Sequence, residues 1–570
     1  MCGITGFVDG NHRTTEAVLK AMTDIIAHRG PDGDGHYTDS TTLAAIGLGH
    51  RRLSIIDLSH AASQPMTAFP LHIVFNGEIY NYAEIQKELM AKGHQFQTHS
   101  DTEVILHAWQ EWGPNCLHKF HGMFAFAIYD QQEQKLFLVR DRAGAKPLFW
   151  YQQNGLFLFG SELKSFHQHP DFIKELDHSA LAAYLQYGYV PTPHCIFRNT
   201  YKLRPGHYLE LDINNQHGQE KEYWNVLDLY NQPKWEAPLP ELISETEKIL
   251  ERSFQYRMVA DVPVGVFLSG GYDSTLVTAL LQKNSGSRIK TFTIGVHDKG
   301  LNEADFAKQT AAHLGTDHTE YYCSTKEALE IVPGLPFHYD EPFADSSAIP
   351  TTLVSKLARE KVTVALSADA GDEIFAGYNK YDYIARAKKK IDYLPSPLRK
   401  TLAALMKQLP AHKIPYFSSK PLFTTRYKKI VHLLKDNSAT ELLHNMSSLF
   451  FEEDLQQLLI HQPQKLSSYF QERLKPAFED DLSYMMAIDY KTYMLDDILQ
   501  KVDRATMTAS LEGREPFLDQ DIIEFAARIP SAYKMHNGTK KYILREIVHR
   551  YVPKEMMERP KMGFGIPIGN

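Results

Sequence analysis

The pattern of apolar and polar positions along the chain changes near residue 240. Before that point, short apolar runs alternate with turn residues, as at residues 71–75, 122–130 and 135–142, which is typical of antiparallel strands. Residues 15–28 and 82–92 instead repeat apolar side chains every three or four positions, which predicts helices. The pattern suits two sheets with helices outside them.

After residue 240, predicted strands alternate with predicted helices. Helices are expected at residues 242–260, 274–282 and 303–314, and strands at residues 262–268 and 289–296. Such alternation favours a parallel, doubly wound sheet. The stretch from about 380 to 480 is expected to be mainly helical. We therefore divide the chain into a first domain (1–210), a closing hairpin and linker (211–238) and a second domain (239–570).

Composition narrows the class of protein. A chain of 570 residues exceeds what one hydrophobic core usually serves, and 43% hydrophobic with 23% charged residues is ordinary for a globular enzyme. The net charge of −8 gives no reason to expect nucleic-acid binding, and no apolar run reaches the ~18 residues of a membrane helix. Four scattered cysteines without a Cys-x-x-Cys pair fit a reducing cytoplasm.

The first candidate for chemistry is Cys2. If Met1 is removed, Cys2 carries a thiol and a free α-amine on one residue. An α-amine has a pKa near ~8, so part of it is neutral and can serve as base for the thiol. A small buried residue at the start of a strand is the alternative.

Four further blocks follow Cys2: His-Arg-Gly-Pro-Asp at 28–32, Gly-His-Arg-Arg-Leu-Ser-Ile at 49–55, Phe-Asn-Gly-Glu-Ile-Tyr-Asn at 75–81 and Ser-Asp-Thr-Glu at 100–103. In this order they resemble the glutaminase domain of class II glutamine amidotransferases. The resemblance implies that Asn76 and the Gly77 N–H form the oxyanion hole for an amide attacked by Cys2. It also implies a glutamine site made of Arg52, Ile55, Glu78 and Asp101.

Each of these residues also has a plainer interpretation. Asn76-Gly77 is a common turn pair, and Arg52 or Asp101 would fit an ordinary surface ion pair.

A second block, Phe-Leu-Ser-Gly-Gly-Tyr-Asp-Ser-Thr at 267–275, follows a predicted buried strand and opens a predicted helix. Backbone N–H groups and the helix dipole favour phosphate there, and glycines allow close approach. The block lacks the Lys-Ser/Thr of a Walker A loop and resembles the pyrophosphate loop of ATP pyrophosphatases. A simple turn is the alternative.

A related strand and acidic turn occupy residues 362–378. By resemblance, Asp273 and Asp372 are the carboxylates that hold Mg²⁺ on ATP, since Mg²⁺ prefers oxygen ligands. Capping of the following helix is the alternative role for Asp372.

With further blocks at 495–519 and 559–565, the motifs span nearly the whole chain, which resembles the glutamine-hydrolysing asparagine synthetases. The resemblance implies an α+β N-terminal nucleophile hydrolase domain with αββα layers, followed by an α/β ATP-pyrophosphatase domain with helical additions. It leaves the oligomeric state open, with a homodimer as one possibility. It implies Lys561 as the cation for the leaving pyrophosphate and Asp369 as a catalytic residue. The residues implied to bind ATP are Leu268, Ser269, Gly270, Gly271, Asp273, Ser274, Ile294, Ser367, Ala368 and Tyr378.

The reaction that the resemblance implies is amidation of aspartate through an acyl-adenylate, with AMP, pyrophosphate and glutamate as the other products. Ala368 and Ala370 stand where the family usually has glycine, and Gly513-Arg514-Glu515 replaces the usual Ala-Arg-Val. These departures leave open a different acceptor, such as a uronic-acid sugar of a surface polysaccharide.

Overall fold

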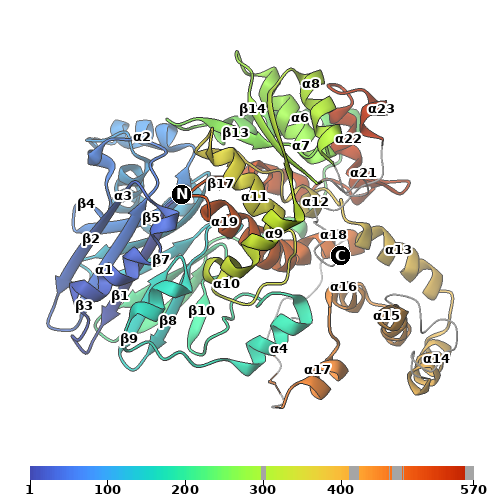
Figure 1. Ribbon diagram of the computed structural model, residues 1–570, viewed down its shortest axis with the longest axis horizontal. Helices are drawn as coiled ribbons and strands as arrows, with labels where there is room; N and C mark the ends of the chain where they lie inside the picture. Colours follow the sequence, from blue (N-terminus) through green and yellow to red (C-terminus); the bar gives the residue numbers. More distant parts are fainter. Residues whose placement is uncertain are drawn as a thin grey trace.

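The structure, a computed structural model, describes residues 1–296, 303–409, 423–460, 463–464, 466, 478 and 480–558. Figure 1 shows the first domain as a lobe on the left and the second domain as a lobe on the upper right, with helices extending below it. The amino terminus lies where the lobes meet, beside β17 (Glu512–Arg514). No helix in the described part of the chain is long and apolar enough to cross a membrane.

The described residues of the first domain form two antiparallel sheets that share one buried core. The first sheet contains, in spatial order, β10 (Thr200–Lys202), β8 (Phe149–Gln153), β9 (Leu156–Gly160), β1 (Gly3–Asp9), β3 (Ala45–Arg52) and β2 (Gly33–Ser40). The second contains β12 (His217–Glu222), β11 (His207–Asp212), β7 (Lys135–Arg140), β6 (Gly122–Asp130), β5 (Leu71–Ile79) and β4 (Met66–Ala68). β11 and β12 form an antiparallel hairpin that extends the second sheet, and it begins at His207, ahead of the predicted boundary at residue 211.

Helices cover the outer faces of both sheets. α1 (Glu16–Asp24) and α4 (His178–Tyr187) share a core with the first sheet. α2 (Tyr82–Ala91) and α3 (Asp101–Trp112) share another with the second sheet. The predicted αββα layering is therefore confirmed, because each sheet has one face toward its partner and the other toward helices.

Strand β5 continues through Asn76 and Gly77 instead of turning there. Asn76 pairs with Ala125 of β6, and Gly77 pairs with Phe124. A Cβ atom on residue 77, where φ is +151°, would lie 2.1 Å from the carbonyl oxygen of Met123. Only glycine fits so close to the neighbouring strand. The turn interpretation of this pair is wrong, and the sheet itself fixes Asn76.

The described residues of the second domain contain a parallel five-stranded sheet, as predicted. In spatial order its strands are β15 (Asp317–Cys323), β14 (Lys290–Val296), β13 (Val264–Phe267), β16 (Val364–Leu366) and β17. Along the chain, β14 and then β15 are added on one side of β13, and β16 and then β17 are added on its other side. Ligand crevices in such sheets form at the carboxyl ends of the strands beside this switch point.

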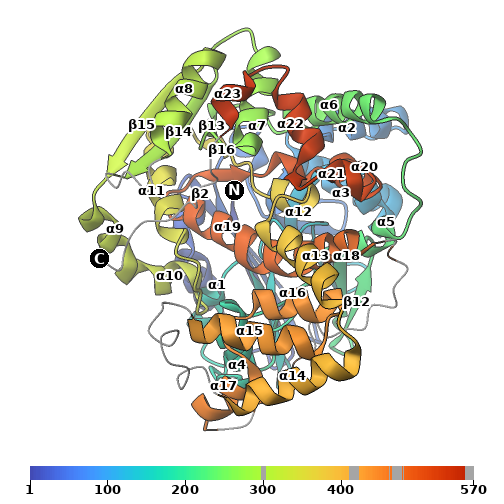
Figure 2. The same ribbon diagram turned by 90° about the vertical axis from the view of Figure 1, so that its right-hand side faces the viewer.

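Helices surround this sheet and extend from it. Figure 2 shows the helices from α13 to α17 gathered at one end of the molecule, away from α6, α7 and α22. The predicted helical content of residues 380–480 is confirmed for the part that the structure describes. The helices are α5 (Val226–Tyr230), α6 (Leu239–Tyr256), α7 (Tyr272–Lys283), α8 (Ala304–Leu314), α9 (Thr325–Ile331), α10 (Leu335–Tyr339), α11 (Ala348–Arg359), α12 (Gly371–Ile374), α13 (Asn379–Ile391), α14 (Ser396–Gln408), α15 (Phe423–Lys435), α16 (Ala439–Ser447), α17 (Glu452–Leu458), α18 (Asp481–Asp489), α19 (Gln500–Met507), α20 (Gln520–Ala527), α21 (Ser531–Lys534), α22 (Tyr542–Val548) and α23 (Lys554–Met557).

A π-helical stretch, Tyr490–Leu499, joins α18 to α19 without a break. π-Helical turns are rare and occur frequently at functional sites. Ile498 at the end of this stretch and Lys501 in α19 both line the larger cavity described below.

Candidate active sites

The first site is built around Cys2, which precedes β1 at the junction of the two domains. Its side chain is buried, and its backbone N–H donates to Asn76 Oδ1 at 3.0 Å. This bond uses the oxygen of the Asn76 amide and leaves its nitrogen available. Among the described residues, Asn76 Nδ2 is a buried donor that has no hydrogen-bond partner. Because an unpaired buried donor is costly, such a group calls for an explanation. An oxyanion formed beside Cys2 would supply an acceptor for this donor.

Met1 lies ahead of Cys2 and determines the chemical state of the Cys2 α-nitrogen. With Met1 present, its ammonium group is buried and pairs with Glu512 of the second domain at 2.7 Å. The α-nitrogen of Cys2 is then an amide and cannot act as a base. Burial raises the pKa of the Cys2 thiol. The thiol therefore needs a nearby base, which removal of Met1 would create.

A small cavity at Cys2 brings the predicted glutamine-binding residues together. Arg52, Ile55, Glu78 and Asp101 line it with Cys2 and Gly77, as predicted from the sequence. Arg52 is oriented by the loop after β3, since its guanidinium donates to the carbonyl oxygens of residues 57 and 59 at 2.5 and 2.9 Å. A guanidinium held in this way presents a planar fork that suits a carboxylate.

Two acidic side chains give this cavity its capacity for a cation. Asp101 begins α3 and accepts from the backbone N–H of Ile79 at 3.0 Å. Burial raises the pKa of Asp101 to about 7. Burial, together with the charge of Glu512, also raises the pKa of Glu78 well above its ordinary value. A bound ammonium group would lower both pKa values, so the pair suits the α-ammonium of an amino acid.

The second site is a cavity of about 640 Å³ at the carboxyl ends of the central parallel strands. It collects the predicted nucleotide-binding residues from β13, β14 and β16, which lie far apart in the sequence. The predicted residues that line it are Leu268, Ser269, Gly270, Gly271, Asp273, Ser274, Ile294, Ser367, Ala368, Asp369, Asp372 and Tyr378. Their side-by-side placement follows from the parallel register, in which Val266 pairs with Leu366.

The glycine-rich loop is shaped for an anion. Gly270 adopts φ +71°, and Gly271 caps the amino terminus of α7. Ser269 Oγ lies 3.0 Å from Ser274 Oγ, which closes the loop on itself. The first residues of α7, a helix of 12 residues, line the cavity, and the start of a helix favours phosphate.

Sequence reasoning missed Lys541, which is central to this site. Lys541 precedes α22, is buried, and pairs with both Asp273 and Asp372, at 2.5 Å in the second case. Burial opposes the charge of Lys541, but the two carboxylates raise its pKa above the ordinary value. A Cβ on Gly377 would collide with Asp372 Oδ1 and Lys541 Cε, so the packing is close. The Lys540-Lys541 pair gave no signal because nothing local links it to the glycine-rich loop.

The two carboxylates fit a magnesium site that a nucleotide would complete. Asp273 lies against the acidic turn, since a Cβ on Gly371 would be 2.9 Å from Asp273 Cγ. Two carboxylates beside a phosphate-binding loop form the donor set that Mg²⁺ uses with nucleotides. Asp273 and Asp372 would hold the ion, which would offset charge on the phosphates. Lys561, predicted for a related role, lies outside the described residues.

Asp369 lines the same cavity and accepts a hydrogen bond from Ser367 Oγ. Lys501, on α19, lines the same cavity and pairs with Asp345 at 3.3 Å. Burial lowers and the charges of Asp369 and Asp345 raise the pKa of Lys501, with a net increase. A cation, Lys501, and a carboxylate, Asp369, therefore line the same cavity.

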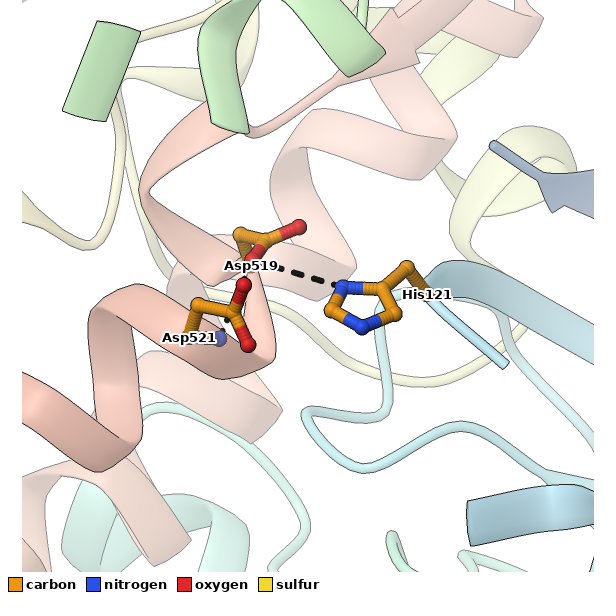
Figure 3. Close-up of side chains that lie close together, drawn as sticks. All are labelled: His121, Asp519 and Asp521. Atoms are coloured by element: carbon orange, nitrogen blue, oxygen red, sulfur yellow. Dashed lines mark hydrogen bonds and ion pairs between the residues drawn. The ribbon is translucent and has the colours of Figure 1, made fainter. Parts of the chain in front are cut away.

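Figure 3 shows a third cluster, in which ligand atoms of His121, Asp519 and Asp521 lie within 4.8 Å of one another. Asp519 pairs with the buried Arg257, and Asp521 pairs with Arg252 at 2.5 Å. Each carboxylate has an arginine partner, and none of the three residues lines either cavity described above. The cluster is a polar contact between the domains, since His121 belongs to the first domain and both aspartates to the second.

Comparison with known proteins identifies the class. Residues 245–570 match the family model described as asparagine synthase, and residues 1–224 match the model of the glutamine amidotransferase domain. The chain therefore belongs to the asparagine synthase family.

The chain covers most of the length of the curated relatives that it resembles. Glutamine-hydrolysing asparagine synthetase 1 of Bacillus subtilis is 35% identical over 586 residues, which span 100% of this chain and 87% of the relative. Asparagine synthetase 3 of the same organism is 29% identical, with 98% and 86% covered. Amidase chyE of Penicillium rubens is 27% identical, with 99% and 88% covered.

Proposed function

We propose that this chain is an ATP-dependent, glutamine-hydrolysing amidotransferase that converts a carboxylate to an amide, with aspartate as the first candidate acceptor. The observation that carries the proposal is the buried Asn76 amide, which is fixed on Cys2 by one end and offers an unpaired donor at the other. The cavity with the glycine-rich loop and two carboxylates supplies a matching nucleotide site. Relatives named asparagine synthetase support the same activity.

In the first site, the processed Cys2 amine takes the proton of its own thiol, and the thiolate attacks the side-chain amide of glutamine. The tetrahedral oxyanion accepts from Asn76 Nδ2 and the Gly77 N–H. Arg52 binds the α-carboxylate, while Asp101 and Glu78 bind the α-ammonium. The protonated Cys2 amine then gives this proton to the amide nitrogen, the oxyanion collapses, and the C–N bond breaks to release ammonia and leave a thioester. Water hydrolyses the thioester to glutamate and free Cys2.

In the second site, a carboxylate oxygen of the acceptor attacks the α-phosphorus of ATP, forming an acyl-adenylate and releasing pyrophosphate. The glycine-rich loop holds the phosphates. Lys541 offsets the charge that grows on the departing pyrophosphate, with Lys561 as a further candidate for this role. Ammonia then attacks the acyl carbon, AMP leaves with the bonding electron pair, and the lost proton passes to a nearby base, for which Asp369 is placed.

Ammonia must reach the second site without protonation in bulk water. The cavities lie in different domains that meet at a buried interface, where Met1 and Glu512 are almost without exposure. We expect an enclosed passage through this interface. Removal of Met1 would free space in it.

The decisive experiment compares nitrogen sources. Cys2→Ala is expected to abolish glutamine-dependent synthesis, while added ammonia still supports it at close to the wild-type rate. Loss of both activities would argue against two separable sites. Mass spectrometry of the purified protein checks that the mature chain begins at Cys2.

The acceptor is tested by pyrophosphate release across aspartate and a panel of uronic acids. A uronic-acid acceptor is the second candidate, because Ala368 and Ala370 alter the acidic turn of the cavity and a relative is named an amidase. Release of ADP in place of AMP with every acceptor would contradict the proposed adenylation.

Three further predictions accompany this function. We propose a cytoplasmic protein, which fractionation of the source cells tests. We also propose a homodimer, which light scattering of the purified protein tests. Limited proteolysis within residues 211–238, yielding fragments of 1–210 and 239–570, tests the proposed division into domains.

A further inference from the structure

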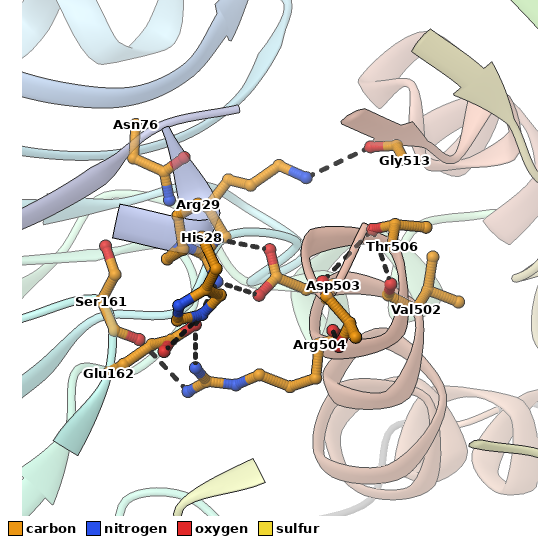
Figure 4. Close-up of polar contacts among 12 residues, drawn as sticks. His28, Arg29, Asn76, Ser161, Glu162, Val502, Asp503, Arg504, Thr506 and Gly513 are labelled. Carbon is orange, nitrogen blue, oxygen red and sulfur yellow. Dashed lines mark hydrogen bonds and ion pairs between the residues drawn. The ribbon is translucent and has the colours of Figure 1, made fainter. Parts of the chain in front are cut away.

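A buried network of charged side chains joins the two domains next to Cys2 (Figure 4). Arg29, the last residue of a short 3₁₀ helix before β2, donates from Nε to the Cys2 carbonyl oxygen at 3.0 Å. Its two terminal nitrogens form a pair of bonds to Asp503 of α19, at 2.8 and 2.9 Å. The side chains of Arg29 and Asp503 are 0% and 3% exposed. A carboxylate of the second domain therefore contacts the residue that holds Cys2.

The backbone of Cys2 is held at both ends. Asn76 Oδ1 accepts from its N–H, and Arg29 donates to its carbonyl oxygen. The position of the thiol relative to Asn76 Nδ2 depends on both contacts. An error of about 1 Å in such a geometry is enough to cost on the order of 100-fold in rate.

Asp503 is the partner that fixes the plane of the Arg29 guanidinium. A bidentate carboxylate defines both position and orientation of this rigid fork. Glu162 also accepts from Arg29 at 2.8 Å, but it is shared with Arg504 at 2.6 Å, with Lys164 and with His28. Burial raises and Arg29 lowers the pKa of Asp503, with a net decrease, so the carboxylate stays ionised.

The same helix extends to the second cavity. Lys501 lies two residues before Asp503 on α19 and lines the nucleotide cavity. One short helix thus contributes to both sites. The first domain alone lacks the Asp503 contact, and Arg29 would keep Glu162 as a carboxylate partner without the bidentate bond that fixes its plane.

We propose that Arg29 and Asp503 are positioning residues for Cys2, so that the nucleophile of the first domain is aligned by a carboxylate of the second. The inference rests on the proposed role of Cys2. Docking of the two domains then completes the glutaminase site, which limits glutamine hydrolysis to chains whose nucleotide site is also assembled.

The test uses the full chain and the variants Asp503→Asn, Asp503→Glu and Asp519→Asn. Asp519 is the matched control, because it is a buried aspartate of the second domain that pairs with an arginine and contacts the first domain away from Cys2. For each variant we measure kcat and KM for glutamate formation, ammonia-dependent pyrophosphate release, and the midpoint of thermal unfolding.

Asp503→Asn is expected to lower kcat for glutamate formation at least tenfold, with KM changed less than threefold and ammonia-dependent release changed less than twofold. Asp503→Glu should recover part of kcat, since it restores a charged partner. Asp519→Asn should leave the ratio of the two activities within twofold of wild type, even if the unfolding midpoint falls.

An Asp503→Asn variant with wild-type kcat would overturn the inference. So would a parallel loss of both activities in Asp503→Asn with the same pattern in Asp519→Asn, since that is the result of general destabilisation. Failure of the proposed function itself is a different result: Cys2→Ala would then still form glutamate.

Discussion

The two sites differ in how the chain fixes their polar groups. At Cys2, antiparallel strands place the polar groups, since Asn76 and Gly77 are ladder positions of β5 and the Cys2 N–H holds Asn76 Oδ1. At the nucleotide cavity, loops after parallel strands carry the polar groups, and Lys541 holds the carboxylates together. A site for one small amide can be built from strand residues. A nucleotide is larger and needs a crevice, in which Lys541 compensates the charges of Asp273 and Asp372 in the absence of ligand.

Substitution of Lys541 is expected to have the largest effect, because it should impair the second site and leave the first site intact. Lys541→Met is expected to reduce pyrophosphate release more than about 100-fold, because a buried charge aimed at the leaving group is lost and two carboxylates face each other unneutralised. Glutamate formation should stay within about twofold. The control is Lys540→Met, which removes a neighbouring lysine that lines the cavity and pairs with Asn379. Equal losses in the two variants would contradict a specific role for Lys541.

Asn76→Ala tests the preformed donor of the first site. Removal of one oxyanion donor typically costs ~3 kcal/mol, so glutamate formation should fall about 100- to 1,000-fold in kcat. Synthesis from added ammonia should be unchanged, because the second domain does not use this amide. If both activities fell together, Asn76 would be a structural residue and not a donor to the oxyanion.

The pH dependence of glutamine binding separates the two sites further. The pKa of Asp101 is about 7, so the carboxylate becomes ionised as the pH rises through 7, and KM for glutamine should fall up to tenfold per pH unit below that point. The effect on folding has the opposite sign: because the folded pKa exceeds the unfolded value of 3.8, the stabilising contribution is complete below pH 3.8 and is lost as pH rises through 7.

Asp101→Asn should raise KM for glutamine about 10- to 100-fold, the value of a lost charged hydrogen bond. It should also remove the pH dependence of KM near 7 while ammonia-dependent synthesis keeps its own profile. An unchanged KM profile in the variant would assign that titration to another group, with Glu78 as the neighbour to examine.

The smallest expected effect concerns the backbone of the acidic turn. Ala370 adopts φ +74°, a left-handed conformation that costs an L-residue about 1–2 kcal/mol. Ala370→Gly removes this cost but adds about 0.4–1 kcal/mol of unfolded-state entropy, so the net stabilisation should be about 0.5–1 kcal/mol. Thermal or urea unfolding measures it. Ala368→Gly is the control, and it should destabilise slightly because its φ is not positive; a gain in both variants would contradict the argument.

Local sequence motifs predicted much of the fold and many of the candidate site residues. The layering of the first domain followed from strand and helix periodicity, and the glycine-rich loop was recognisable because a buried strand, a turn and a helix start are neighbours in sequence. Residues such as Cys2, Asn76, Asp273 and Asp372 lie inside such motifs. The structure brings Cys2, Asp273 and Asp372 to two cavities, and it joins Asn76 to Cys2 by a hydrogen bond. Asn76 lies in a strand, although its sequence pair is typical of a turn.

Other residues depend on contacts that no local pattern encodes. Strand β17 has only three residues and joins the sheet through pairing of Leu366 with Arg514. Lys541 meets Asp273 across 268 positions of chain, and Arg29 meets Asp503 across 474. Periodicity carries no information about such pairs, because each side chain alone would be equally suited to solvent.

The sequence by itself determined the classes of element, the motifs that flank each strand, and the residue types that the two chemistries require. Those properties depend on neighbours within a few residues, where backbone geometry and side-chain spacing act directly. Only the tertiary structure decided which charges are buried together and which domain supplies them. Burial makes an ion pair strong and an unpaired charge costly, and burial is a property of the folded chain as a whole.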